Sequence, residues 1–268
     1  MDPENISTER AAYHKAKAFY SVDDDKYLLE DNIDIGFPPA SVTKLLTSAT
    51  ALKYMSADDI ITVGDEYDLV KPYSSLCYIL PGHKLRLFDL LTGLLLPSGN
   101  EAAYSIAAAA ARAAYPDREM TSAQAVECFV GLMNEYAVSI GMNNSFFVTP
   151  EGWDDDRQYV TARDLITLGL HILSIPVIRE ITATHSRRVV FESGERITWT
   201  NINRLLNPES EFYCKDAIGF KTGTTDKAGA SLLAAFVRND KTYISFVTGC
   251  KTTEDRYIET LEMLRRFT

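Results

Sequence analysis

The chain has 268 residues, of which 46% are hydrophobic and 24% charged, as in an ordinary globular protein. Its net charge of −10 argues against nucleic-acid binding, because phosphate recognition needs a basic face and the arginine pairs at 187–188 and 265–266 are isolated. The four cysteines show no C-x-x-C spacing, which disfavours a zinc or redox motif, and they are too few for a disulfide scaffold. Whether two of them pair stays open.

The beginning of the chain carries no visible targeting signal. Residues 1–10, MDPENISTER, are polar and acidic, so no signal peptide is present in this sequence. No apolar run reaches membrane-spanning length, since Arg112 interrupts the alanine-rich stretch 105–115. We therefore expect a soluble chain without visible membrane anchoring, from which a leader or anchor could have been left out.

Strand patterns come first along the chain. Residues 15–30 predict two short strands joined by an acidic turn at 23–25. Pro38-Pro39 then holds the chain extended, because proline disfavours helix in the residue before it. Apolar spacing predicts a helix from Val42 to about Met55, and residues 58–70 have strand character.

The middle of the chain is predicted to be helical. The helical stretches are residues 85–114, 123–142 and 161–173. The first is broken at 97–99, and Gly141 is a plausible C-cap of the second. Thr161 is the expected N-cap of the third, with Asp164 in the capping-box position.

The last third of the chain is rich in strand patterns. Five short segments separated by turn residues predict strands: 187–193, 195–201, 217–224, 230–238 and 242–250. Residues 254–267 predict an amphipathic helix. Strands thus lie at both ends of the chain. We expect an α+β fold in a single domain, 1–268: one antiparallel sheet built from both chain ends and flanked by helices, with a mostly helical block at about 60–180.

Three short motifs carry the candidate chemistry: Ser41-Val-Thr-Lys44, Ser98-Gly-Asn100 and Lys221-Thr-Gly223. Each alone has an ordinary interpretation, respectively an N-cap, a turn between helices and an edge strand with a lysine. Their joint occurrence in this order is much less expected by chance. S-x-x-K with S-D-N and K-T-G is a known signature of penicillin-binding proteins and class A β-lactamases.

Ser41 and Lys44 suit a nucleophile and its base. Residues three apart share a helix face, so Lys44 can lie against the Ser41 hydroxyl. A serine needs a neighbour to take its proton, yet no histidine has a recognisable triad setting and no G-x-S-x-G elbow exists. Lys44 would need a lowered pKa, from burial and from the nearby cation Lys221. The backbone N–H groups and dipole of the first helical turn would stabilise an oxyanion beside Ser41.

The second motif offers a proton relay and a substrate contact. The Ser98 hydroxyl, placed between Lys44 and Lys221, could pass a proton to the leaving amine. The Asn100 amide both donates and accepts hydrogen bonds, which suits a substrate peptide group.

The third motif lies in a predicted strand. Gly223 would let a substrate backbone approach as an added strand. The backbone N–H of Thr224 would be a second oxyanion donor beside that of Ser41. Thr222 and Thr224 offer hydroxyls to a substrate carboxylate.

Longer segments extend the similarity. In order, they are PPASVTKLLT, LLLPSGNEAA, FVTPEGWDDDRQYVTARDL, TNINRLL, IGFKTGTTDKAGASLLAAFVR and DRYIETLEMLRRF. Through them the chain resembles the D-alanyl-D-alanine carboxypeptidases, which are low-molecular-mass penicillin-binding proteins with the β-lactamase/transpeptidase-like fold.

The resemblance implies an exported cell-wall enzyme without a metal or organic cofactor. It would remove the terminal D-alanine of peptidoglycan stem pentapeptides through an acyl-enzyme on Ser41, and β-lactam antibiotics would acylate the same serine. Arg256 matches an arginine that in some members helps to bind the terminal carboxylate. A surface helix arginine is an equally open interpretation of Arg256.

The chain departs from the family pattern at residues 149–153. Thr149, Glu151 and Trp153 stand where the family usually has an asparagine–histidine–glycine–leucine type of sequence. We expect this change to alter the substrate rim rather than the chemistry. Asp154–Asp156 lack the alternating ligand spacing of a calcium loop, so we expect a solvated turn there.

Two alternatives stay in view. A serine β-lactamase shares the fold and the acylation step, but no Glu-x-x-x-Asn loop lies between Ser98 and Lys221, and Glu151 is the only acid to nominate. A non-catalytic penicillin-binding sensor is disfavoured, because a pure binder needs no nucleophile–base pair. Many relatives carry a further C-terminal domain and a membrane-surface helix, and this chain ends soon after its last predicted helix.

Overall fold

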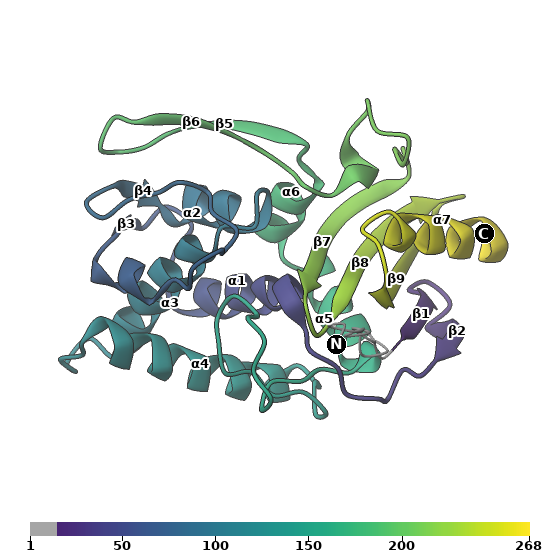
Figure 1. The fold of residues 1–268 in the computed structure, drawn as a ribbon, viewed down its shortest axis with the longest axis horizontal. Coiled ribbons are helices and arrows are strands. Elements are labelled where there is room, and N and C mark those ends of the chain that lie inside the picture. Colours follow the sequence, from purple (N-terminus) through teal and green to yellow (C-terminus); the bar gives the residue numbers. More distant parts are fainter. Residues whose placement is uncertain (1–14) are drawn as a thin grey trace, which may run out of the picture.

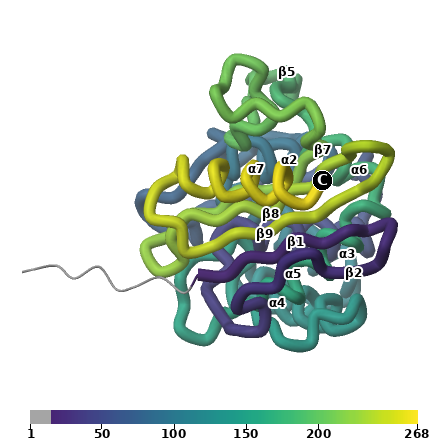
Figure 2. The backbone as a smooth tube through the Cα atoms, turned by 90° about the vertical axis from the view of Figure 1, so that its right-hand side faces the viewer, coloured from purple at the N-terminus to yellow at the C-terminus, as the bar shows by residue number. Residues whose placement is uncertain are grey.

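A five-stranded antiparallel sheet forms the frame of the molecule, in the order β2-β1-β9-β8-β7 (Figure 1). The computed structural model describes residues 15–268, so the polar opening segment 1–10 lies outside the described residues. The strands are β1 (Ala16–Ser21), β2 (Lys26–Asp31), β7 (Ala217–Thr225), β8 (Gly229–Arg238) and β9 (Lys241–Cys250). Because β1 pairs with β9, the sheet is built from both chain ends, as predicted (Figure 2).

The remaining elements are helices and two small hairpin sheets. The α-helices are α1 (Thr43–Tyr54), α2 (Leu87–Leu95), α3 (Asn100–Ala114), α4 (Ser122–Ser139), α5 (Ala162–Leu173), α6 (Pro176–Ala183) and α7 (Asp255–Phe267). Short 3-10 helices are η1 (Ala40–Val42), η2 (Asp65–Leu69) and η3 (Arg204–Leu206). The hairpin sheets pair β3 (Ile60–Thr62) with β4 (Lys84–Arg86), and β5 (Ser186–Val190) with β6 (Arg196–Thr200).

Both faces of the main sheet are buried. On β8, Leu232 and Phe236 belong to a core that contains Tyr257 of α7, whereas Leu233 belongs to the larger core shared with the other helices. Alternate residues of a strand point to opposite faces, so a strand covered on both sides reads as a continuous apolar run. This explains the sequence SLLAAF in β8. Figure 2 shows α7 lying across β8 and β9 on one side of the sheet.

Helix α1 runs through the middle of the molecule, between the sheet and the helical block (Figure 1). Every residue from Thr43 to Ala51 is buried. A helix buried on all sides is fixed by packing on each face, so the side chains at its N-terminal end have defined positions. Lys44 is one of them.

Several predicted elements are confirmed. The hairpin within residues 15–30 forms β1 and β2, and the chain breaks between α2 and α3 at 97–99. Gly141 has φ +96°, and the Met142 N–H donates to the carbonyl of Ala137 at 2.9 Å, which closes α4 as expected.

Other local predictions are wrong or half right. Residues 58–70 form only the three-residue β3 followed by η2, and β5 with β6 is a separate hairpin rather than part of the main sheet. Thr161 Oγ1 caps α5 by accepting from the Asp164 N–H at 3.1 Å. The Asp164 carboxylate does not return the bond, because it accepts from the N–H of Asn144 and the hydroxyl of Ser145.

Two questions left open by the sequence concern membrane segments and cysteines. Among residues 15–268 no single helix is long and apolar enough to span a membrane, although α5 and α6 taken together, bent by 102°, reach that length and composition. All four cysteines are free thiols.

Candidate active site

Ser41 lies at the entrance to α1, in η1. The preceding Ala40 adopts a left-handed φ of +49°, and the α-helix begins two residues after Ser41, at Thr43. The N-cap position of α1 is Val42 and has no side-chain cap. The N-cap interpretation of Ser41 is therefore wrong. Its hydroxyl instead accepts a hydrogen bond from Lys44 Nζ at 2.8 Å.

Lys44 is fully buried and has three acceptors. Besides Ser41 Oγ, its Nζ donates to Asn100 Oδ1 at 2.8 Å and to the main-chain carbonyl of Glu151 at 3.1 Å. Burial lowers the pKa of Lys44 to about 8, while the nearby carboxyl groups of Glu151 and Glu101 act in the opposite direction. Lys44 therefore gives up its proton far more readily than a surface lysine.

Asn100 links α3 to the loop before β4. Its backbone N–H donates to the Ser75 carbonyl at 2.8 Å, and its Nδ2 donates to Ser74 Oγ at 3.0 Å. Both ends of the amide are thus engaged by protein groups, Lys44 and Ser74. Asn100 thereby holds Lys44 Nζ in place, and its predicted contact with a substrate peptide group stays a prediction.

Ser98 lies in the turn before α3 with a left-handed φ of +69°. Its side chain is buried, and Oγ makes no hydrogen bond within the described residues. The predicted relay from Lys44 through Ser98 to Lys221 is therefore not connected by hydrogen bonds in this arrangement. A buried hydroxyl without a partner is costly, so the hydrogen-bonding capacity of Ser98 Oγ is unused in this arrangement.

Lys221 is the second fully buried lysine, on β7. Its Nζ donates to the carbonyl of Thr222 at 3.3 Å. Burial holds the pKa of Lys221 well below its usual range, and the charges of Lys44 and Arg256 lower it further. We expected burial and the nearby cation of Lys221 to lower the pKa of Lys44. Burial does lower it, whereas the charge repulsion between the two lysines lowers the pKa of Lys221.

Gly223 lets β7 pack closely against η1. A Cβ on this residue would lie 3.0 Å from the Ala40 Cβ and 2.5 Å from the Ser231 hydroxyl. The protein's own packing therefore requires glycine at this position, and the expected approach of a substrate backbone stays a prediction. The close approach brings the Lys221–Thr224 segment beside Ser41.

Thr224 and Arg256 form a pair at the end of the motif. Arg256 reaches from α7 to β7, where its Nη1 donates to Thr224 Oγ1 at 3.1 Å and to the Gly223 carbonyl at 3.2 Å. Arg256 is only 7% exposed, so the surface-arginine interpretation is wrong. Thr224 lines the cleft at Ser41, whereas Thr222 is buried and does not.

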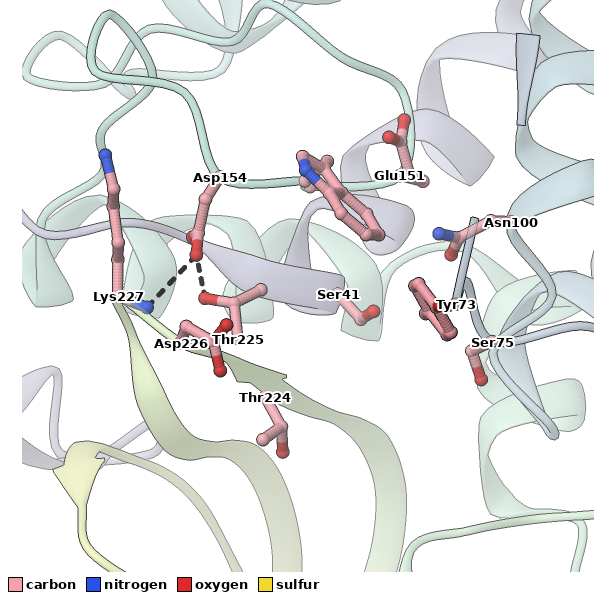
Figure 3. Close-up of a pocket in the computed structure, with 12 residues that line it drawn as sticks. Ser41, Tyr73, Ser75, Asn100, Glu151, Asp154, Thr224, Thr225, Asp226 and Lys227 are labelled. Carbon is pink, nitrogen blue, oxygen red and sulfur yellow. Dashed lines mark hydrogen bonds between the residues drawn. The ribbon is translucent and has the colours of Figure 1, made fainter. Parts of the chain in front are cut away.

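A cleft of about 620 Å³ opens at Ser41 (Figure 3). It is lined by Ser41, Tyr73, Ser75, Asn100, Glu151, Gly152, Trp153, Asp154, Thr224, Thr225, Asp226 and Lys227. Sequence reasoning missed Tyr73 and Ser75, because their polar loop carries no periodicity or motif. It also missed the hairpin turn after β7, since Asp226 and Lys227 look like ordinary turn residues.

The acidic triplet 154–156 is more than a solvated turn. Asp154 accepts from Thr225 Oγ1 at 2.7 Å and from the Lys227 N–H at 3.0 Å, and so ties its loop to the β7–β8 hairpin (Figure 3). Asp155 pairs with Arg157. The contacts of Asp154 fix one end of the cleft.

The loop of residues 149–153 lies against the entrance of α1. Gly152 has φ +91°, and a Cβ there would lie 1.8 Å from the Ala40 carbonyl oxygen. Thr47 Oγ1 donates to the Pro150 carbonyl at 2.5 Å, which fixes the loop to α1. The Glu151 side chain is buried beside Lys44, and Glu151, Gly152 and Trp153 all line the cleft. The expectation that this departure alters the substrate rim rather than the chemistry stays a prediction.

Comparison with known proteins places the chain in a family. The sequence model of the D-alanyl-D-alanine carboxypeptidase family matches residues 5–252. The chain is 34% identical over 248 residues to D-alanyl-D-alanine carboxypeptidase DacC of Escherichia coli K12 and 33% identical to DacA of the same organism. In both cases the match covers 89% of this chain and 57% of the relative, so the chain spans just over half the length of these relatives.

Solved structures agree with this assignment. The Streptomyces K15 DD-transpeptidase superimposes with a TM-score of 0.83 at 26% identity, covering 96% of both chains. The carboxypeptidase DacD of Francisella tularensis, at 24% identity and a TM-score of 0.78, covers 99% of this chain and 71% of its own and shares the fold. The chain belongs to the D-alanyl-D-alanine carboxypeptidase family of serine peptidases.

Proposed function

We propose that the chain is a serine D-Ala-D-Ala carboxypeptidase, acylated at Ser41 and also acylated by β-lactams. The observation that carries the proposal is the position of Lys44 Nζ, buried and in contact with Ser41 Oγ and two carbonyl oxygens. The family assignment supports it independently. The substrate would be a peptidoglycan stem peptide, and the protein would work outside the cytoplasm, where that polymer is assembled.

The three contacts of Lys44 define its role as a base. As an ammonium ion, Nζ donates to all three acceptors. When it loses one proton, the two carbonyl oxygens of Asn100 and Glu151 can only accept, so they keep the two remaining N–H groups. The lone pair is then directed at Ser41, the one partner that can donate. The neutral amine is thereby oriented to take the hydroxyl proton.

In the acylation step, Ser41 Oγ forms a bond to the carbonyl carbon of the penultimate D-alanine while its proton passes to Lys44. The oxyanion that forms would be stabilised by the backbone N–H groups of Ser41 and Thr224, together with the N-terminal end of α1. The C–N bond then breaks, and the terminal D-alanine leaves with a proton on its amine. The free hydroxyl of Ser98 is the proposed carrier of that proton.

In deacylation, water attacks the ester carbonyl, its proton returns through Lys44, and Ser41 Oγ is released as a hydroxyl. The substrate carboxylate is assigned to Thr224 and Arg256, because Thr224 lines the cleft and the Arg256 guanidinium donates to its hydroxyl. Lys221 supplies a further buried amine beside them, with Thr222 and Gly223 setting the strand geometry.

The β-lactamase alternative is weaker. Glu151 is the acid nominated from the sequence, but its carboxyl group is directed away from Ser41 (Figure 3). It is therefore not placed to activate water at the acyl-enzyme carbonyl. We expect β-lactams to form a long-lived adduct.

The proposal is tested with a labelled penicillin and a D-Ala-D-Ala-ended peptide. Wild type should form a covalent adduct and release D-alanine, and Ser41→Ala should do neither. An adduct without D-alanine release would indicate a sensor, rapid release of hydrolysed penicillin would indicate a β-lactamase, and no adduct would rule out the acyl-enzyme.

A further inference from the structure

Glu151 is a buried acid that the proposed mechanism uses only through its main chain. Its side chain is 2% exposed. Oε1 accepts a hydrogen bond from the Tyr104 hydroxyl of α3 at 3.1 Å, while Oε2 is buried and has no partner in the described part of the chain. Burial of a carboxylate needs a compensating interaction, and the cation that favours the charged form of Glu151 is Lys44.

The main chain fixes the carboxyl group with respect to Lys44. The Glu151 carbonyl accepts directly from Lys44 Nζ, and the loop is fixed to α1 through the contact between Thr47 and Pro150. The carboxyl group points away from Ser41 (Figure 3), so it has no direct access to the reacting atoms. Its influence on catalysis must pass through Lys44.

We propose that Glu151 is a positioning residue for the reaction at Ser41. Its buried carboxylate is the counter-charge that sets the pH range in which Lys44 becomes a neutral base. This inference rests on the proposed acylation of Ser41. A carboxylate favours the ammonium form of its neighbour, whereas a neutral side chain does not.

Other charged groups around Lys44 do not replace Glu151. Glu101 of α3 also favours the ammonium form of Lys44, but its Oε1 already accepts from the N–H groups of Cys77 and Tyr78, at 2.7 Å each, and only its Oε2 has no partner among residues 15–268. Burial and Glu101 keep the Cys77 thiol protonated by raising its pKa, and the charge of Lys44 lowers the pKa of Lys221 on β7. Of the charged residues described around Lys44, only Glu151 also contacts its Nζ directly, through the main-chain carbonyl.

Tyr104 favours the ionised form of the Glu151 side chain by donating a hydrogen bond to it. Burial and the Glu151 carboxylate raise the pKa of Tyr104, so its hydroxyl stays protonated and donates. Burial raises the pKa of Glu151, and Lys44 and the Tyr104 hydrogen bond oppose that rise. Removing the Tyr104 hydroxyl would therefore raise the pKa of Glu151 and reduce its negative charge, while the carboxyl group stays in place.

The test is the pH dependence of the rate constant for acylation by labelled penicillin. Loss of the counter-charge in Glu151→Gln should shift the midpoint of the rising limb to lower pH, by about one unit. Tyr104→Phe should shift it in the same direction by less. Asp164→Asn, a buried acid remote from the cleft, should leave the midpoint unchanged, and thermal unfolding verifies that each variant is folded.

The outcomes separate this inference from the proposed function. If wild type is acylated and Glu151→Gln lowers the rate equally at every pH, or moves the midpoint upward, the positioning role is wrong and Glu151 only supports the loop. If wild type is not acylated at all, the proposed function fails first. A downward shift in Glu151→Gln that Asp164→Asn lacks supports the inference.

Discussion

At the scale of single residues, the candidate site depends on a lysine that must be buried and yet able to lose its proton. Burial lowers the pKa of Lys44 to about 8. Only the neutral amine can take the Ser41 proton, so the acylation rate should rise about tenfold per pH unit below that value and level off above it. Stopped-flow measurement with a chromogenic cephalosporin between pH 5.5 and 9.5 checks this. A rate that falls with rising pH would contradict the assignment of Lys44 as the base.

Arg256 gives a residue-scale test of substrate binding. Hydrogen bonds to charged groups are worth about 1.5–3 kcal/mol, so Arg256→Gln should lower kcat/KM for a peptide with a free terminal carboxylate about ten- to a hundredfold. The corresponding C-terminal amide should lose little. Arg265→Gln, exposed on the last turn of the same helix, serves as the control. Equal losses for both peptides would show that Arg256 only stabilises β7.

At the scale of elements, the loop of residues 149–153 packs against η1, just before the first turn of α1. The Cβ of Gly152→Ala would collide with the Ala40 carbonyl, one residue from Ser41. Displacement of a nucleophile by about 1 Å costs about a hundredfold in rate, and we expect a loss of acylation of this order. Penicillin labelling kinetics provide the measurement.

Gly194 offers a matched control for that prediction. It also has a left-handed φ, +103°, but no atom of the described residues lies within 4 Å of the position that a Cβ would take. Gly194→Ala should therefore cost only the left-handed backbone strain, about 1–2 kcal/mol in the free energy of unfolding, and retain full acylation. If both variants acylate at the wild-type rate, the 149–153 loop does not position Ser41.

The elements that sequence patterns predict correctly are those set by local properties of the chain. Ser41, Lys44 and the hairpin of β1 and β2 follow from spacing and from turn residues, which are local properties. Tyr73, Ser75 and the buried position of Glu151 depend on long-range contacts, such as those of Asn100 with the loop before β4. The strand predicted over 58–70 forms only as β3, because Gly64 interrupts the run and the acidic residues after it are disfavoured in strands.

At the scale of the whole molecule, the two-sided burial of the sheet explains how distant chain segments meet at one cleft. Helix α7 packs on one face and brings Arg256 to β7, while α1 lies toward the other face and brings Lys44 to the same place. Tyr257 of α7 is fully buried, and its hydroxyl donates to the Ile202 carbonyl at 3.1 Å. The packing of the cores therefore sets the distances in the site.

This architecture makes adjacent residues of β8 equally important for stability. Leu232 and Leu233 are both fully buried, on opposite faces. Each change to alanine should lower the free energy of unfolding by about 2–5 kcal/mol, measured by urea denaturation. Val237→Ala, on the same strand but 44% exposed, should change it by no more than about 0.5 kcal/mol. A sheet with one solvent-facing side would make one of the two leucine variants as mild as the valine variant, and that result would disprove the covering of both faces.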